Sequence, residues 1–148
     1  MPSSPALPPI EWKVHLASSP AAVFELLTTD RGRERFWAEH SRCEDSTFTL
    51  TFSGGEQLRC AVVAEAASQH FAFRYFADTL VEITLTLDEA GGTDLSLTEI
   101  GFADAAHRSE NYAGWIQVLL CLKAAVDHKV DLRNHDAART WSRGYCEG

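Results

Sequence analysis

The spacing of the apolar residues changes once along the chain, near Gly101. Before this point several segments alternate apolar and polar residues, as Leu80 to Leu87 does, and a period of two is typical of half-buried strands. After it, from about Ser109 to Val130, apolar residues recur at the 3.6-residue spacing of a helix. Hairpin-linked strands followed by one long helix predict an antiparallel sheet with the helix on one face.

The remaining segments fit the same plan. Ile10 to Leu16 alternates and predicts a first strand. Ser19 and Pro20 suit the cap and first turn of a short helix, and a second helical turn is expected over 31–38. Further strands are expected over 47–52, 56–64, 71–75, 80–87 and 93–102. We therefore expect an α+β fold in which a curved antiparallel sheet of six or seven strands surrounds a long C-terminal helix.

The predicted C-terminal helix has two distinct sides. Its apolar stripe consists of Tyr112, Trp115, Ile116, Leu119, Leu122, Val126 and Val130. The opposite side carries Cys121, which we expect at the surface. The other cysteines, Cys43, Cys60 and Cys146, are far apart in the sequence and form no Cys-x-x-Cys pair. Four reduced thiols are therefore expected, as in a cytoplasmic protein.

The charge of the chain narrows the classes of partner. A formal net charge of −8 disfavours nucleic acid and anionic membrane surfaces, because both attract basic proteins. No apolar run reaches the roughly 20 residues of a membrane helix. No basic segment followed by an apolar stretch begins the chain, so we expect no signal peptide and a cytoplasmic location. Residues 1–9 carry four prolines and predict a flexible lead-in.

Five short motifs occur in order between residues 10 and 131: Val23-Phe24, Phe36-Trp37, Gly91-Gly92-Thr93, Gly101-Phe102 and Gly114-Trp115. Together they resemble the START-like (SRPBCC) superfamily. Within it, the chain is similar to the branch related to the C-terminal domain of the activator of heat-shock protein 90 ATPase. The resemblance implies a helix-grip (START-like, Bet v-like) domain over 10–131, with two short helices after the first strand. Residues 132–148 would extend that domain.

The same resemblance implies three functions. Members of the superfamily keep an apolar tunnel between sheet and helix and bind lipids, sterols, hormones or polyketides, so a domain that binds a small apolar or aromatic ligand is expected first. Some members are cyclases, which implies an enzyme of the cyclase or hydratase kind as an alternative. The family co-chaperone implies a stress-response interaction domain, although it works beside a separate N-terminal domain for which 148 residues leave no room.

Large aromatic residues are numerous, and they line most small-molecule pockets as well as ordinary cores. Among them, Tyr75 and Tyr112 each bring a hydroxyl that could orient a ligand. The candidate cavity residues are Trp12, Trp37, Phe48, Phe73, Tyr75, Glu99, Tyr112, Trp115, Leu119 and Lys123.

Glu99 shares a strand face with Leu95 and Leu97 if the alternation continues to the end of that strand. A carboxylate on the cavity side needs a partner, and Lys123, at the edge of the helix stripe, is the candidate. The pair would anchor a polar group of the ligand. Alternatively, Glu99 lies at the frayed mouth of the sheet and Lys123 extends to water.

Other charged residues carry weaker signals. Arg59 and Arg74 lie on neighbouring predicted strands and could bind an acidic ligand, but alternation places Arg74 toward solvent. His107 and Glu110 are the only local pair of metal-ligand types on a helix, which does not make a metal site. There is no Gly-x-Ser-x-Gly segment and no phosphate-binding glycine loop. We therefore predict no catalytic residue, metal or cofactor, and homodimerisation through a sheet edge or the outer helix face.

Overall fold

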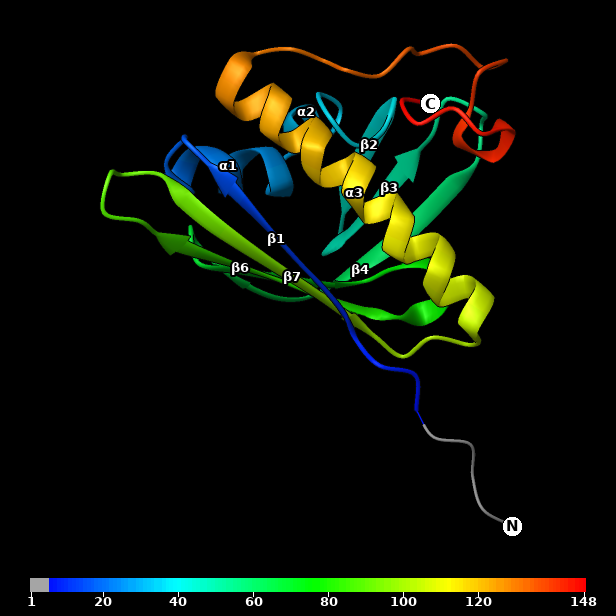
Figure 1. Cartoon of the computed structure of the whole chain (residues 1–148), viewed down its shortest axis with the longest axis horizontal. Helices are drawn as coiled ribbons and strands as arrows, with labels where there is room; N and C mark the ends of the chain where they lie inside the picture. Colours follow the sequence, from blue (N-terminus) through cyan, green and yellow to red (C-terminus); the bar gives the residue numbers. More distant parts are fainter. Residues whose placement is uncertain (1–5) are drawn as a thin grey trace.

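The computed structural model describes residues 6–148 and shows strands first and one long helix last (Figure 1). Residues 1–5 of the expected lead-in lie outside the described residues. The elements are β1 (Ile10–Leu16), α1 (Pro20–Thr28), α2 (Asp30–Arg33), β2 (His40–Glu44), β3 (Thr47–Thr51), β4 (Gln57–Ala66), β5 (His70–Arg74), β6 (Leu80–Leu87), β7 (Thr93–Ile100) and α3 (Ala105–His128). Two short 3-10 turns cover Phe76–Asp78 and Trp141–Arg143.

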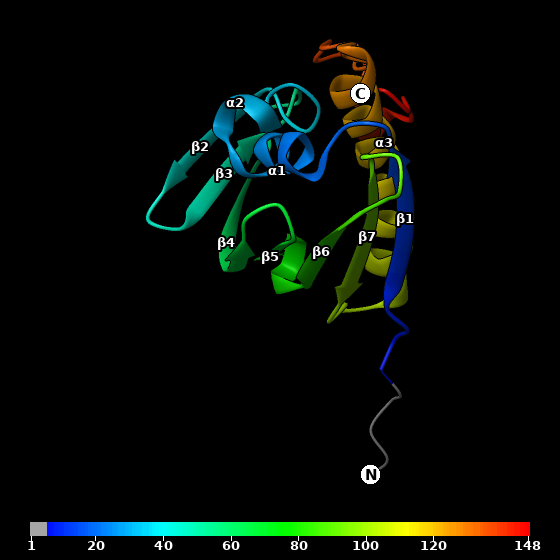
Figure 2. The ribbon, with the colours of Figure 1, turned by 90° about the vertical axis from the view of Figure 1, so that its left-hand side faces the viewer.

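The seven strands form one sheet in the order β1-β7-β6-β5-β4-β3-β2, with every neighbouring pair antiparallel. Figure 2 shows the sheet curving around α3, which lies close to β1, while β2 to β4 diverge from it. A strongly twisted antiparallel sheet can wrap around a helix in this way. The expected α+β helix-grip architecture is confirmed, with seven strands and two short helices after the first.

Most strand bounds agree with the sequence prediction to within two residues, whereas the start of α3 and the presence of β2 differ from it. α3 begins at Ala105, earlier than expected, because the Asp104 side chain caps it by accepting a hydrogen bond from the His107 backbone N–H at 2.8 Å. β2 was not predicted as a separate strand. Only one of its five residues, Ser41, is buried, so its sequence lacks the alternation that marked the other strands.

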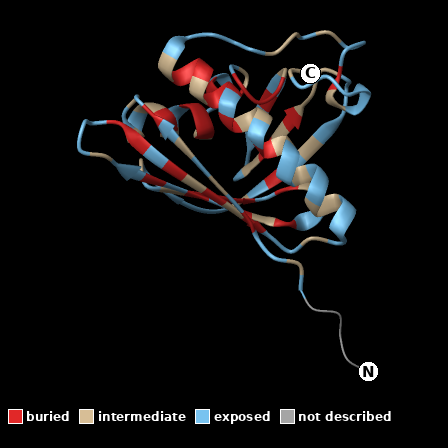
Figure 3. Cartoon of the chain, viewed as in Figure 1, coloured by how far each residue is buried: buried red, intermediate tan, exposed pale blue. Residues whose placement is uncertain are grey.

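Buried residues occur along the sheet, α1 and α3 (Figure 3), and many of those in the core are aromatic. The ring centroid of Trp37 lies 5.8 Å from that of Phe48 and 5.5 Å from that of Phe73. Phe71 and Leu119 are also buried in this core. The core is therefore solid over this region, and any ligand must bind beside it.

The segment after α3 turns back toward the β3–β4 end of the sheet (Figure 1). We call residues 130–148 the tail. Arg133 attaches it by donating hydrogen bonds to the backbone oxygens of Ala38 and Glu34, at 2.8 and 2.6 Å. Gln117 of α3 also donates to the Gly148 oxygen at 2.7 Å. The tail thus packs on the domain core.

This packing corrects the expectation for Cys121, which is buried rather than at the surface. Burial raises the pKa of its thiol, partly opposed by the positive charge of Arg133 in the tail. Burial also raises the pKa of Cys60, to about 12. All four cysteines are free, and these two buried thiols stay protonated at neutral pH.

The apolar stripe predicted for the C-terminal helix is too wide. Tyr112, Ile116 and Val130 are exposed, whereas the Trp115 side chain and three residues behind it, Leu119, Leu122 and Val126, are buried. The side of α3 that carries Cys121 is also buried. The outer face presents apolar side chains, Ile116 and Leu120 among them, to solvent. Within the described chain, no helix is both long and apolar enough to cross a membrane.

Candidate ligand pocket

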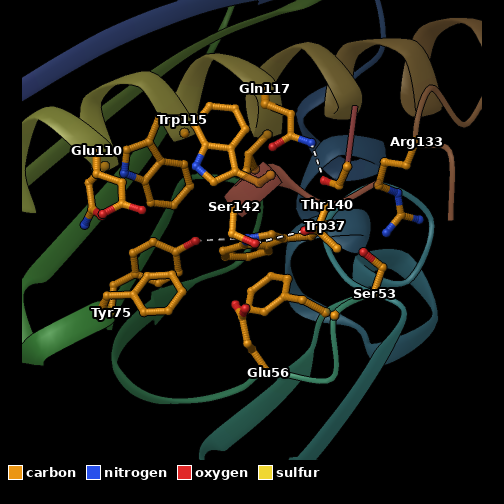
Figure 4. Close-up of a pocket in the computed structure, with 18 of the residues that line it drawn as sticks. Trp37, Ser53, Glu56, Tyr75, Glu110, Trp115, Gln117, Arg133, Thr140 and Ser142 are labelled. Carbon is orange, nitrogen blue, oxygen red and sulfur yellow. Dashed lines mark hydrogen bonds between the residues drawn. The ribbon is translucent and has the colours of Figure 1, made fainter. Parts of the chain in front are cut away.

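A pocket of about 370 Å³ opens between α3 and the β3–β4 end of the sheet. Four other parts of the chain complete its walls: the segment after α2, the β3–β4 hairpin, the segment after β5, and the tail. Figure 4 shows side chains from these parts converging on one space. Its aromatic lining consists of Phe36, Trp37, Phe52, Tyr75, Phe76, Trp115 and Trp141. Such a composition is usual for small-molecule pockets.

Three of these rings form the inner wall, each from a different part of the fold. Tyr75 and Trp115 stack with centroids 4.8 Å apart, and Trp37 lies 6.0 Å from Tyr75 and 5.9 Å from Trp115. Aromatic pairs at such distances contribute about 0.5–1.5 kcal/mol beyond their burial. Because these rings also pack on the core behind them, the inner wall is preformed.

The Tyr75 hydroxyl has an unused hydrogen-bond donor. It accepts a hydrogen bond from Trp37 Nε1 at 3.3 Å, and within residues 6–148 no acceptor takes its own proton. Tyr75 is only 8% exposed. Burial raises the pKa of this phenol far above its ordinary value, partly opposed by the Trp37 hydrogen bond. Tyr75 is therefore a neutral donor that lines the pocket.

Glu99 lies behind this wall and has no exposed surface. Its Oε1 accepts a hydrogen bond from Trp115 Nε1 at 2.8 Å, and its Oε2 accepts from Thr79 Oγ1 at 2.6 Å and from Asn111 Nδ2 at 2.9 Å. These bonds satisfy the buried carboxylate. Glu99 therefore holds the Trp115 ring in place and does not itself line the pocket.

The expected partnership of Glu99 with Lys123 does not form. Lys123 donates to the backbone oxygen of His15 at 2.6 Å and to Asp127 Oδ2 at 3.3 Å. It lies on the side of α3 that faces β1. The alternative expectation, that Glu99 lies at a frayed sheet mouth, is also wrong, because the strand pairs on both sides there, with Ile10 of β1 and Val81 of β6.

His107 presents a second polar atom without a partner. Its Nδ1 is buried and makes no hydrogen bond within the described part of the chain, while its Nε2 lies 3.3 Å from Asn111 Nδ2. Glu99 sets the direction of the Asn111 amide, since a carboxylate can only accept. Asn111 therefore donates to His107 Nε2, which leaves the proton of the neutral imidazole on Nδ1. His107 is one of the residues that line the pocket, but its Nδ1 is itself buried without a partner among the described residues.

Three charged side chains also line the pocket: Glu56, Glu110 and Arg133. Arg133 makes its hydrogen bonds elsewhere, to Asp131 and to two backbone oxygens, and its side chain is only 6% exposed. Glu56 and Glu110 are exposed, and neither side chain makes a hydrogen bond or ion pair with another residue between 6 and 148. The uncompensated charge at the pocket is therefore negative.

The predicted cavity residues are distributed over several places. Trp37, Tyr75 and Trp115 line the pocket together. Phe48, Phe73 and Leu119 are buried in the core and do not line it. Trp12 and Tyr112 pair between β1 and α3, away from the pocket, with ring centroids 4.6 Å apart and Trp12 Nε1 donating to the Tyr112 oxygen at 3.0 Å. Glu99 lies behind the inner wall of the pocket, and Lys123 lies on the side of α3 that faces β1.

Several lining residues were missed in the sequence. Phe52 and Glu56 flank the Ser53-Gly54-Gly55 turn, and Trp141 lies in the tail. Each lies where a regular element ends, in segments that often carry function. Arg59 and Arg74 are exposed and do not line the pocket. Among residues 6–148, no group of three or more His, Cys, Asp or Glu side chains is placed to hold a metal ion.

Solved structures with the same architecture identify the fold. A protein from Staphylococcus saprophyticus is 27% identical, with a TM-score of 0.74 over 84% of this chain and 96% of that one. The Aha1 dimer from Colwellia psychrerythraea is 19% identical, with a TM-score of 0.75 over 82% and 98%. The chain has the START-like fold. Neither a family model nor a curated protein sequence matches it.

A third neighbour is DynU16, a protein of the dynemicin biosynthetic locus. It is 17% identical, with a TM-score of 0.73 over 83% of this chain and 48% of that one. The START-like resemblance, with an Aha1 protein among the structural neighbours, is confirmed at the level of the fold. This fold supports a ligand-binding or interaction domain in general.

Proposed function

We propose that the pocket binds a small ligand with an apolar or aromatic body and a hydrogen-bond acceptor. The observation that carries this proposal is the buried Tyr75 hydroxyl, which belongs to a pocket-lining residue and has no protein acceptor for its proton among residues 6–148. A pocket of about 370 Å³ lies within the usual range of about 300–1,000 Å³ for small-molecule sites.

The alternatives make different demands on the structure. A cyclase or hydratase needs an acid–base group in contact with its substrate, but Glu99 is sealed behind Trp115, which leaves His107 as the candidate. An interaction domain needs an exposed apolar surface outside the pocket, and Ile116 and Leu120 on the outer face of α3 offer a small one. Homodimerisation is a further proposal, supported by the Colwellia Aha1 dimer. The preformed pocket favours ligand binding over both.

The first test is native mass spectrometry of the purified protein, followed by extraction of anything bound and a thermal-shift panel of lipids and aromatic acids. A stoichiometric small molecule, or a shift with members of the panel, is the expected result. An apo mass together with no shift across the panel would contradict ligand binding.

The role of the Tyr75 hydroxyl is tested with acetophenone and ethylbenzene, which differ in one carbonyl acceptor. We expect Tyr75→Phe to weaken acetophenone binding about threefold to tenfold, as for one net hydrogen bond, and to leave ethylbenzene unaffected. Calorimetric titration measures both affinities. Tyr112→Phe, outside the pocket, is the matched control and should change neither. Equal losses for both ligands in Tyr75→Phe would remove the hydroxyl from the proposal.

A further inference from the structure

The pocket has aromatic walls, and its charged side chains without a partner in the described chain are both acidic. Seven aromatic side chains line it, and aromatic ring faces attract cations through their negative quadrupole. The lining cation, Arg133, already binds Asp131 and two backbone oxygens. Its charge is therefore matched before any ligand enters.

The two acidic side chains of the lining have no such partner. Glu56 comes from the β3–β4 hairpin and Glu110 from α3, so they lie on different walls of the pocket (Figure 4). Neither carboxylate has a hydrogen-bond or ion-pair partner elsewhere in the described chain. A ligand is then the group that can supply the opposite charge. An anion of the same shape would instead be repelled by both carboxylates and by the net charge of −8.

We propose that the ligand carries a positively charged amine, tertiary or quaternary, attached to its apolar or aromatic body. This inference rests on the proposed ligand-binding function and adds the charge of the ligand. The ammonium group lies near Glu56 and Glu110, where aromatic rings and carboxylates both stabilise it. The acceptor end of the same ligand reaches the Tyr75 hydroxyl at the inner wall.

Three probes with one aromatic body and a similar tetrahedral head test the charge. Phenyltrimethylammonium carries a charge of about +1, tert-butylbenzene is its neutral carbon isostere, and benzenesulfonate carries about −1. Tryptophan fluorescence reports binding, because Trp37, Trp115 and Trp141 line the pocket. We expect the cation to bind tightest and the anion weakest. High salt should weaken the cation most, because it screens exposed carboxylates.

The matched variants decide whether the pocket carboxylates cause the preference. Glu56→Gln combined with Glu110→Gln should lower the affinity ratio of the cation to the neutral probe about tenfold, because two exposed ion pairs with the ligand are lost. Glu11→Gln combined with Glu65→Gln changes the net charge equally at exposed strand positions and should leave that ratio unchanged.

Two results would overturn the inference. Only the second would also contradict the proposed ligand binding. If the neutral probe binds and the ratio is the same in both double variants, the charge assignment is wrong while ligand binding stands. If none of the three probes binds, the pocket is closed to aromatic ligands, and the proposed function fails with the inference. Circular dichroism of the variants checks that each remains folded.

Discussion

Two groups of polar side chains lie close to the aromatic core, and they differ in how completely they are paired. In the first, Arg33 is 1% exposed and donates to Ser41 Oγ at 2.8 Å, to the Leu27 oxygen at 3.0 Å and to Asp30 Oδ1 at 2.8 Å. Its guanidinium also lies 4.3 Å from the Phe48 ring centroid. We call Arg33, Asp30 and Ser41 the Arg33 cluster. Each of its members has its partners within the protein.

The second group lines the pocket, and its members have hydrogen-bonding groups or charges without a partner among the described residues. Tyr75 has a proton without an acceptor, His107 has a buried nitrogen without a partner, and Glu56 and Glu110 have no counter-charge within the described residues. Unpaired buried polar groups cost about 1–3 kcal/mol each. The Arg33 cluster is therefore structural, whereas the pocket lining keeps polar groups that a ligand can pair with.

The largest effect should come from breaking the Arg33 cluster. Arg33→Met keeps much of the side-chain volume but removes the donor to the Leu27 oxygen and the counter-charge of Asp30, and we expect a loss of about 3–5 kcal/mol in the free energy of unfolding. Urea unfolding followed by circular dichroism measures it. Arg31→Met, exposed on the same short helix, is the control and should change stability by less than about 0.5 kcal/mol. A loss as small as that of the control would show that the cluster is not structural.

A second fully paired group joins the two ends of the fold at Asp127. Its carboxylate accepts from the backbone N–H groups of Ala17 and Ser18, at 2.9 and 3.0 Å, and from the Ser18 hydroxyl at 2.8 Å. Burial raises the pKa of Asp127, but these hydrogen bonds together with Lys123 outweigh it and lower the pKa to about 2. The side chain is 3% exposed.

We expect Asp127→Asn to destabilise the protein by about 1–3 kcal/mol at pH 7, because the amide replaces an acceptor by a donor. The folded pKa lies below the ordinary value of 3.8, so the stabilisation is complete above that value and is lost as the pH falls toward 2. Unfolding curves from pH 2 to 7 should therefore converge for wild type and variant at the acid end. Asp94→Asn, at a more exposed carboxylate, is the control. A difference that is constant with pH would contradict this linkage.

The sequence predicted the fold well because the fold depends on periodic patterns. The alternation of β6 and the stripe of Trp115, Leu119 and Leu122 on α3 are repeated over many residues, and each repeat supports the same assignment. β2 escaped prediction because one buried residue in five makes no pattern. The tail escaped because its position depends on single hydrogen bonds, such as that of Arg133 to Ala38.

The pocket was harder to predict because it forms between parts that are distant in sequence. Tyr75 and Tyr112 are equal candidates by residue type, yet Tyr75 follows β5 and lies at the inner wall, whereas Tyr112 packs on Trp12 away from the pocket. The position of Tyr112 depends on how α3 is rotated against the sheet, which residue type alone does not show. Glu99 was placed on the correct face, but its partners Thr79 and Asn111 lie in a loop and on a helix, where alternation gives no information.

The smallest expected effect concerns His135 of the tail, which pairs with Glu39 and Asp131. Its ring nitrogens lie 2.6 Å from Glu39 Oε1 and 2.8 Å from Asp131 Oδ2. The hydrogen bond to Glu39 raises the pKa of His135, burial lowers it, and Asp131 raises it further, with a net increase above 6.5. The protonated ring thus links the tail, which forms one wall of the pocket, to the segment before β2.

Because the folded pKa is raised, this link is complete below about pH 6.5 and is lost as the pH rises through the folded pKa. The side chain is 40% exposed, so we expect less than about 1 kcal/mol, as for surface ion pairs. Hydrogen-exchange protection factors for residues 132–148 should fall between pH 6 and 8.5, more than those of the core strands. His135→Asn removes the titration and tolerates the φ of 57° at this position. If the tail of this variant still loses protection over the same pH range, then His135 is not the group that holds it.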